Sequence, residues 1–195
     1  MARGLTDDEL PAGVRAFRAG DEVGILAAMH RMHDRGELEG VDRPFLAESA
    51  ERMASEPWLV SVAEDEGRLA GWVAPVHDDL SVDLPFRRRG HGTRLVEAGR
   101  RMAAATGRTE LRLWVPHRPD AEAFARALRF RYQSSLWKLR LDPTTPVAAP
   151  AFPDDVVVRW VEPGADDAAV VDVANTIFLD HPSPIQLELE HVARV

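Results

Sequence analysis

The stretch LSVDLPFRRRGHGTRLVEAG, residues 80–99, decides how the rest of the chain is interpreted. Its alternating start, 80–84, predicts a strand, and the apolar spacing over 94–106 predicts a helix. Between them lies a basic loop that contains two glycines, 85–93. The first amides of a helix have no intrahelical acceptors, and the helix dipole places positive potential at that end. A strand, a glycine loop and a helix N-terminus in this order therefore predict a site for an anion such as a phosphate.

The residues of this loop suit such an anion. Gly90 and Gly92 carry no Cβ that would obstruct a phosphate, and glycine tolerates positive φ. Arg87, Arg88 and Arg89 add positive charge to a chain whose formal net charge is −8. The loop is not a P-loop, because the lysine and the following Ser or Thr are missing, and a meander rather than a Rossmann unit precedes it. A solvated basic loop that only turns the chain is the alternative.

The flanking segments predict an α/β chain. Strands are expected over 14–18, 58–64, 68–76, 80–84, 109–115 and 131–142. Helices are expected over 21–33, 44–54, 94–106 and 116–128. The three strands between 58 and 84 follow one another closely and should form an antiparallel meander. A strand–helix–strand crossover follows the meander, so we expect a mixed, mostly antiparallel sheet flanked by helices.

Composition excludes several classes of protein. Apolar residues make up 45% of the chain and charged residues 29%, which argues against wholesale disorder. No apolar run is long enough for a membrane helix or a secretory signal, so we expect a cytoplasmic protein without a membrane partner. The absence of cysteine excludes disulfides and a thiol nucleophile, and no His/Asp/Glu spacing suggests a metal. The acidic net charge argues against nucleic-acid binding.

An internal repeat follows a proline-rich linker. Residues 143–155 contain four prolines in thirteen positions, which is typical of a domain boundary. Residues 158–164 then align with 14–20, and Asp166 aligns with Asp21, so a valine-arginine strand turns twice into a helix. Chance similarity between two common strand-to-helix starts is the alternative. The repeat predicts a first domain over 1–142, a linker over 143–155 and an incomplete second copy over 156–195.

The loop Arg87-Arg88-Arg89-Gly90-His91-Gly92 resembles the Arg/Gln-x-x-Gly-x-Gly/Ala signature of the GNAT family of N-acetyltransferases. The resemblance covers about residues 14–142 and implies a GNAT fold with acetyl-CoA as cosubstrate and no metal. In that family the loop amides hold the pyrophosphate, and the preceding strand pairs with the pantetheine arm. By position, the pantetheine residues are Val82, Asp83 and Leu84. The pyrophosphate residues are Arg88, Arg89, Gly90, His91, Gly92 and Thr93, with Arg87 beside them. We expect His91 to be exposed beside the phosphates, and Pro85 lies one place later than the family's usual proline.

The repeat resembles tandem GNAT proteins of the mycothiol synthase type. This resemblance implies that residues 156–195 begin a second GNAT repeat with a strand, 156–161, and one or two helices. That strand carries Val156, Val158 and Trp160 on one face, which needs to be covered. We therefore expect the segment to dock on the first domain or on a second copy, and the latter would give a homodimer.

Acetyl transfer to an amine needs a base for the ammonium proton and a donor for the leaving thiolate. The family often uses a tyrosine as that donor, but Ala125 stands at its position. The chain's one tyrosine, Tyr132, is expected to pack in the last strand. Candidate bases are Asp83, Glu64, His77 and Asp79. Asp83 is preferred because its strand runs beside the predicted thioester, and the alternative role for Asp83 is an arginine's partner at the surface.

The resemblance therefore implies an N-acetyltransferase domain that acetylates a primary amine of a small molecule by direct attack. The alternative is a CoA-binding module without catalysis, which would act structurally or in regulation beside a catalytic domain. No side chain in the predicted acceptor region identifies the amine.

Overall fold

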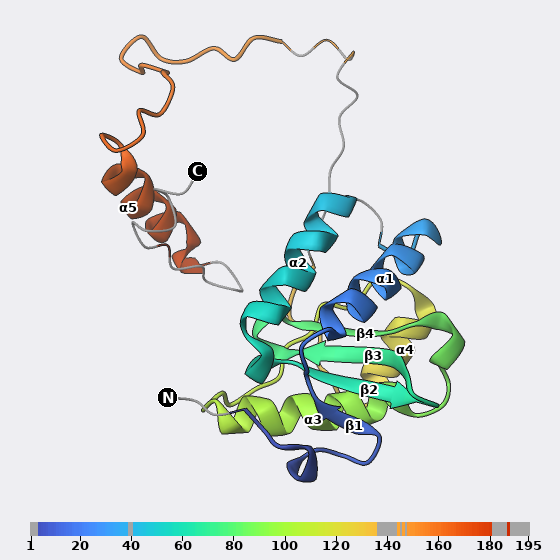
Figure 1. Ribbon diagram of the computed structural model, residues 1–195. Coiled ribbons are helices and arrows are strands. Elements are labelled where there is room, and N and C mark those ends of the chain that lie inside the picture. The colour runs from blue at the N-terminus through green and yellow to red at the C-terminus, as the bar shows by residue number, and fades with distance from the viewer. Residues whose placement is uncertain are drawn as a thin grey trace. The chain divides into compact units, whose positions relative to one another are not determined.

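The computed structural model describes residues 4–38, 41–135, 144, 146, 148–180 and 187. The chain divides into two compact units, Met1–Arg131 and Tyr132–Val195, which are described separately (Figure 1). The domain limits expected from the linker, 1–142 and 156–195, remain a prediction.

Unit 1 is built on the predicted meander. Four antiparallel strands lie side by side in chain order: β1 (Val14–Ala16), β2 (Ser61–Asp65), β3 (Arg68–Ala74) and β4 (Asp79–Val82). Glu66 and Gly67 join β2 to β3, and both have positive φ, 52° and 73°, as a two-residue hairpin turn requires. The cross-strand pairs Val62↔Trp72 and Trp72↔Ser81 fix the register of β2, β3 and β4.

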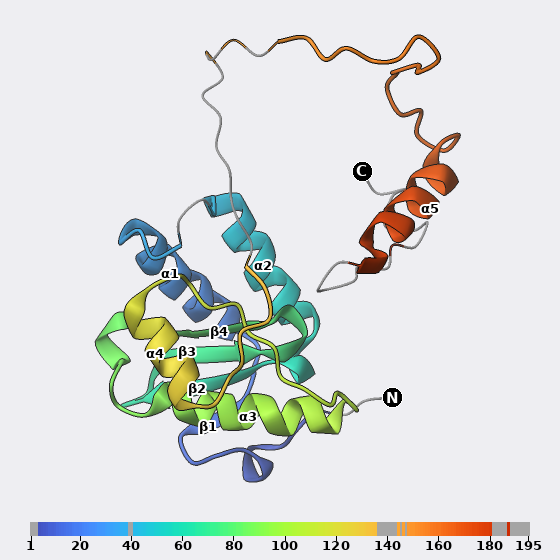
Figure 2. The ribbon, with the colours of Figure 1, turned by 180° about the vertical axis from the view of Figure 1, so that it is seen from behind.

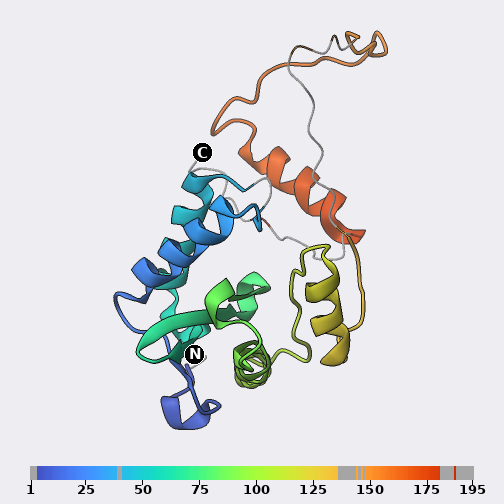
Figure 3. The same cartoon turned by 90° about the vertical axis from the view of Figure 1, so that its right-hand side faces the viewer.

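Helices cover both faces of this sheet. α1 (Asp21–Asp34) and α2 (Arg43–Ser55) lie over one face, and α3 (His91–Ala105) runs along the other (Figures 1 and 2). Because side chains alternate along a strand, Trp72 packs in the core under α1 and α2, whereas its neighbour Val73 packs against α3. Figure 3 shows the three layers from the side. The predictions of helix 21–33, helix 44–54 and the meander are confirmed.

The helix predicted over 94–106 begins three residues earlier, at His91. Gly90 takes the N-cap position of α3 in the left-handed region, with φ of 83°. The first apolar residue, Leu95, suggested a later start because hydrophobic spacing does not report a polar first turn. The next helix, α4 (Pro119–Ala127), lies inside the range predicted for it.

The crossover strand predicted over 109–115 is not formed. This segment makes one backbone hydrogen bond at the start of β4, from the Trp114 N–H to the Asp78 carbonyl at 2.8 Å. A strand needs a partner on at least one side, and residues 131–135, the start of the predicted neighbour, also form no strand. Residues 136–142 lie outside the described residues. Within the part of the chain that the structure describes, the sheet is therefore antiparallel rather than mixed.

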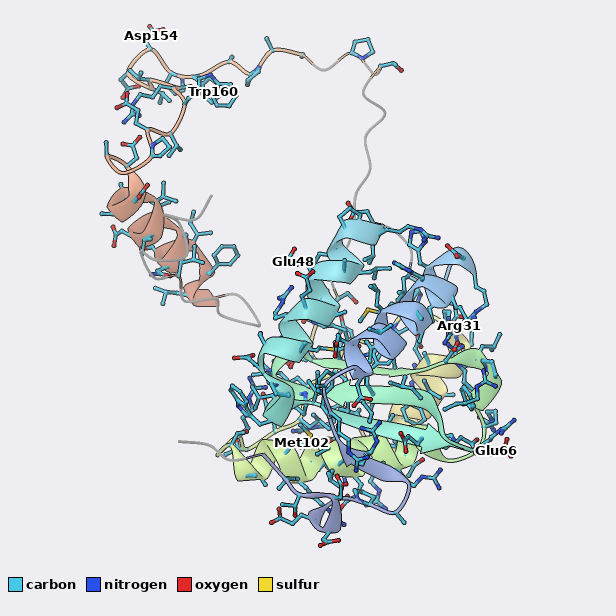
Figure 4. All side chains as sticks on the ribbon, viewed as in Figure 1. Arg31, Glu48, Glu66, Met102, Asp154 and Trp160 are labelled. Atoms are coloured by element: carbon cyan, nitrogen blue, oxygen red, sulfur yellow. The ribbon has the colours of Figure 1, made fainter. Side chains whose placement is uncertain are left out.

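Unit 2 contains one α-helix, α5 (Asp167–Ile177), among its described residues. Residues 156–161 are exposed and form no strand, because no described segment pairs with them; Trp160, labelled in Figure 4, is 93% exposed. None of the helices in the described ranges is both long and apolar enough to cross a bilayer.

Residues 159–166 of unit 2 repeat the side-chain contacts of residues 15–21 of unit 1. Arg15 donates hydrogen bonds from Nη1 and Nη2 to the carboxylate oxygens of Asp21 at 2.7 and 2.8 Å. Arg159 donates from the same two nitrogens to the carboxylate oxygens of Asp166 at 2.6 and 2.8 Å. Each aspartate also accepts a backbone N–H, from Arg18 at 2.6 Å and from Glu162 at 2.8 Å. The aligned sequences thus make equivalent local contacts.

Candidate active site

The connection from β4 to α3 places the signature residues at a helix N-terminus. Leu84 begins the short 3-10 helix Leu84–Phe86, which the carboxylate of Asp83 caps. Gly90 then adopts a positive φ with open space around its Cα, since an added Cβ would come no nearer than 3.9 Å to Arg94. At Gly92 the corresponding space is filled, because an added Cβ would lie 2.9 Å from Cζ of Phe124 on α4. The positive φ therefore favours glycine at 90, and the close approach of Phe124 favours it at 92.

The three arginines of the loop differ in their surroundings. Arg87 donates from Nε to the Val82 carbonyl at 2.9 Å, and its Nη2 pairs with Glu37. Arg89 pairs with Asp65 at 2.9 Å. Arg88 is exposed with φ of 63°, and no carboxylate in the described ranges pairs with it. Arg88 is thus the arginine of the three whose charge is available to an anionic ligand.

His91 corrects the sequence-based expectation of an exposed position, because it is 3% exposed. Its Nδ1 lies 3.0 Å from Nη2 of Arg94, which can only donate, so the proton lies on Nε2 and points to Asp65 at 3.2 Å. The ring also packs edge-on against Phe86. Because α3 begins at His91, the first helical turn carries this ring inward rather than toward a ligand.

The bridge to Asp65 ties the loop to the sheet. Asp65 accepts from both His91 and Arg89, and the hydrogen bond from His91, followed by that from Arg89, lowers the pKa of this carboxyl. Asp65 ends β2, so the hydrogen bond from His91 and the ion pair with Arg89 hold the start of α3 against the β2–β3 hairpin. This arrangement fixes the position of the α3 amides that would face an anion.

Asp83, the preferred base, is locked in an ion-pair cluster. Its side chain is 1% exposed and accepts hydrogen bonds from Arg31 at 2.7 and 2.9 Å and from Arg35 at 2.9 Å (Arg31 is labelled in Figure 4). Burial alone would raise the pKa of Asp83, but the hydrogen bonds from Arg31 and Arg35 hold it below its usual value. A carboxylate held in its charged form by two guanidinium groups is a weak base, so these contacts favour a structural role.

Glu37 extends this cluster and was missed from the sequence. It accepts from Arg35 and Arg87 and from Arg118 at 3.4 Å, which links the α1–α2 connection, the signature loop and the start of α4. Burial raises the pKa of Glu37, whereas the hydrogen bonds from Arg87 and Arg35 bring it below its usual value. Glu37 lies 50 residues from Arg87, in a polar loop without a motif, so no local signal marks it.

Of the other candidate bases, Glu64 lies apart from His77 and Asp79, which are neighbours. Glu64 pairs with Arg15 at 2.7 Å, on the β1 side of the sheet and away from β4. Asp79 begins β4 and accepts from the indole N–H of Trp72 at 2.7 Å. Burial lowers the pKa of His77, two residues before it, and raises the pKa of Asp79.

Tyr132 does not pack as expected. Its side chain is 80% exposed, and its hydroxyl lies 3.1 Å from that of Ser135. The expectation rested on the strand predicted over 131–142, which is not formed over 131–135. In the described residues, no group of three or more His, Asp and Glu side chains is arranged to hold a metal ion.

Comparisons with known proteins identify the family. The sequence model of the Acetyltransferase (GNAT) family matches residues 26–130. The chain is 39% identical over 145 residues to a mycothiol acetyltransferase of Acidothermus cellulolyticus, covering 70% of this chain and 43% of the relative. It is 41% identical over 105 residues to a mycothiol acetyltransferase of Salinispora tropica, covering 53% and 33%. The chain thus spans less than half the length of these relatives.

A solved structure shares the fold. It is AAC(6')-Iy in complex with the bisubstrate analogue CoA-S-monomethyl-acetylneamine, with a TM-score of 0.50 and 16% identity, covering 66% of this chain and 97% of that one. The family match agrees with the meander, the signature loop and α3, and the chain belongs to the GNAT family of acetyltransferases.

Proposed function

We propose that this chain provides an acetyl-CoA-dependent N-acetyltransferase domain that acetylates a primary amine of a small molecule. The observation that carries the proposal is the N-terminus of α3, where Gly90 has positive φ and the charge of Arg88 is available. The connection 83–90 joins this end of the helix to β4, the edge strand of the described sheet. Amides and an arginine suit a pyrophosphate, and an open strand edge suits the amide-bearing pantetheine arm.

The proposed cosubstrate contacts follow the signature. The α3 amides at Gly92 and Thr93 and the side chain of Arg88 hold the pyrophosphate. Val82 and Leu84 meet the pantetheine arm. Arg87, Arg89 and His91 hold the loop in position rather than contact the cosubstrate. Arg87 is paired with Glu37, and Arg89 and His91 are bonded to Asp65. Asp83 positions the loop through Arg31 and Arg35.

The first acceptors to test are the amine substrates of mycothiol acetyltransferases, since the relatives carry that name. A wider panel of small primary amines follows. Release of free CoA thiol reports transfer, and mass spectrometry of the product locates the acetyl group.

A pair of glycine variants tests the cosubstrate site. Gly90 is the N-cap of α3 and Gly107 directly follows its C-cap, with φ of 83° and 77°, so valine strains the backbone similarly at both. Calorimetry should show loss of acetyl-CoA binding for Gly90→Val and unchanged binding for Gly107→Val. Normal binding by a folded Gly90→Val protein would overturn the proposed site. Binding by the wild-type chain without turnover of any amine would instead support the CoA-binding module.

We also propose that residues 156–195 begin a second copy of the fold. The equivalent contacts of Arg15 with Asp21 and of Arg159 with Asp166 support this proposal. A homodimer formed through this segment remains a prediction, which the deletion described in the Discussion tests.

A further inference from the structure

The backbone of β4 leaves one edge open among the described strands. In an antiparallel ladder, alternate residues direct their backbone groups toward the partner strand. The Asp83 N–H bonds the Ala70 carbonyl at 3.0 Å, so Val82 and Leu80 belong to the alternate set that faces the open edge. Arg87 meets the Val82 carbonyl at the end of the strand, and the edge before it is suited to an extended ligand.

At the N-terminal end of β4, residues 109–115 occupy the edge that is open farther along the strand. The Trp114 N–H bonds the Asp78 carbonyl, directly before Asp79, at 2.8 Å. The helix amides that suit a phosphate follow the opposite end of β4. β4 has only four residues, so its first and last Cα atoms are roughly 10 Å apart. A ligand with its phosphates at α3 and its arm along β4 therefore carries its reactive end toward Asp79.

Asp79 and Ser81 lie on the same face of β4, and Asp83 follows directly after the end of the strand. Its Oδ2 accepts from Trp72 Nε1 at 2.7 Å, and Oδ1 lies 3.4 Å from the Ser81 hydroxyl. Trp72 is almost completely buried, so it holds the carboxylate in a fixed orientation. Unlike Asp83, Asp79 has no cationic partner among the described side chains. It is therefore the strand carboxylate whose lone pairs are not committed to a guanidinium group.

The electrostatic surroundings of Asp79 suit proton transfer. Burial raises its pKa, and the hydrogen bonds from Trp72 and Ser81 oppose that rise. The titratable neighbour that interacts with it is His77, whose own pKa is lowered by burial. A carboxylate with a raised pKa takes a proton more readily than an exposed or ion-paired one.

We propose that Asp79 is the general base that deprotonates the acceptor ammonium, an inference that rests on the proposed function. Asp79 takes one proton from the ammonium group. The neutral nitrogen then forms a bond to the acetyl carbonyl carbon, and the carbon–sulfur bond breaks. The second proton of that nitrogen goes to the leaving sulfur, which gives free CoA thiol, and Asp79 releases its proton to water. Trp72 acts as a positioning residue for the carboxylate.

The test compares Asp79→Asn with the control variant Glu64→Gln, which removes another candidate carboxylate, on β2, where it pairs with Arg15 away from β4. Asparagine at 79 still accepts from Trp72, so the fold is retained, and circular dichroism checks this. With the amine that the panel identifies, kcat of Asp79→Asn should fall about 100-fold while acetyl-CoA affinity stays unchanged. Its kcat should also lose the acid limb of the pH profile. Asp79→Glu, which restores a carboxylate, should recover part of kcat, and Glu64→Gln should keep the acid limb.

The outcomes distinguish a failure of the Asp79 assignment from a failure of the proposed acetyltransferase function. If wild-type protein turns over an amine and Asp79→Asn keeps its kcat and acid limb, the assignment of Asp79 is overturned and the proposed function stands. If wild-type protein binds acetyl-CoA but acetylates no amine, the proposed function and the base role fail together. Carbon-13 NMR of labelled aspartate carboxyls adds a readout without turnover. The Asp79 signal should move when acetyl-CoA is added, and an unchanged signal overturns its placement beside the thioester.

Discussion

Replacing Asp83 with asparagine should destabilise the first unit strongly. The carboxylate is almost completely buried and accepts four hydrogen bonds, two from Arg31, one from Arg35 and one from the Leu84 N–H. Asparagine keeps one acceptor oxygen but turns an amide donor toward the donors of Arg31. Breaking a fully buried ion pair costs about 3–5 kcal/mol. The side chains of Arg31 and Arg35 are 48% and 30% exposed and can regain water, so we expect a loss of roughly 2–3 kcal/mol.

Urea unfolding followed by circular dichroism measures this loss. Glu97→Gln is the matched control, because it removes an exposed carboxylate from its pair with Arg101, in which both side chains are nearly half exposed. That variant should keep the wild-type midpoint. Equal midpoints for Asp83→Asn and Glu97→Gln at pH 7 would refute the assignment of Asp83 as a buried structural carboxylate.

The stability difference between wild type and Asp83→Asn should also depend on pH, in a direction that the pKa of Asp83 determines. The pKa of Asp83 is lowered in the folded protein, while an unfolded aspartate titrates at about 3.9. Its contribution to the free energy of unfolding is therefore complete well above pH 4 and is lost as pH falls toward the folded pKa. The difference between wild type and Asp83→Asn should shrink on acidification below about pH 4. A difference that stays constant down to pH 3 would contradict the ion-pair explanation.

Three further predictions concern the ligand, the sheet and the second unit. Acetyl-CoA affinity should fall as salt rises, because exposed charge such as that of Arg88 is screened over about 8 Å at physiological ionic strength; calorimetry that shows no change would favour an apolar ligand. Gly71→Ala should lower the urea midpoint by disrupting β3–β4 pairing, since its Cβ would lie 2.3 Å from the Ser81 carbonyl oxygen. The control Gly24→Ala, whose Cβ would lie 3.4 Å from a Leu69 methyl, should leave that midpoint unchanged or higher. Removing residues 150–195 should lower solubility or change the oligomeric state on a sizing column, because we expect this segment to cover an apolar face; unchanged behaviour would refute that expectation.

The sequence is most informative where the physical cause is local. The alternation over 68–76 and the turn at Glu66 and Gly67 depend on neighbouring residues, so the meander could be predicted. The cap at Gly90 is local as well, and it marks the end of α3 that faces the proposed ligand.

The rest of the site depends on distant partners. Asp83 looks like an open strand carboxylate until Arg31 and Arg35 are brought to it from 52 and 48 residues away. The burial of His91 depends on Asp65, 26 residues earlier. Residues 109–115 have the alternation of a strand but lack a strand partner, which alternation alone does not reveal.

The contact between Arg159 and Asp166 bears on how the polypeptide begins to fold during synthesis. It spans seven residues and is present where no described strand pairs with the segment, so it needs no sheet to form. The equivalent contact between Arg15 and Asp21 spans six residues, whereas the β2 residue that pairs with Arg15 is Val62. Loops of about ten residues close in roughly 10–100 ns, far faster than a ribosome adds the residues of β2. On the nascent chain, the contact between Arg15 and Asp21 can therefore set the direction of α1 before β2, the strand that pairs with β1, has been translated.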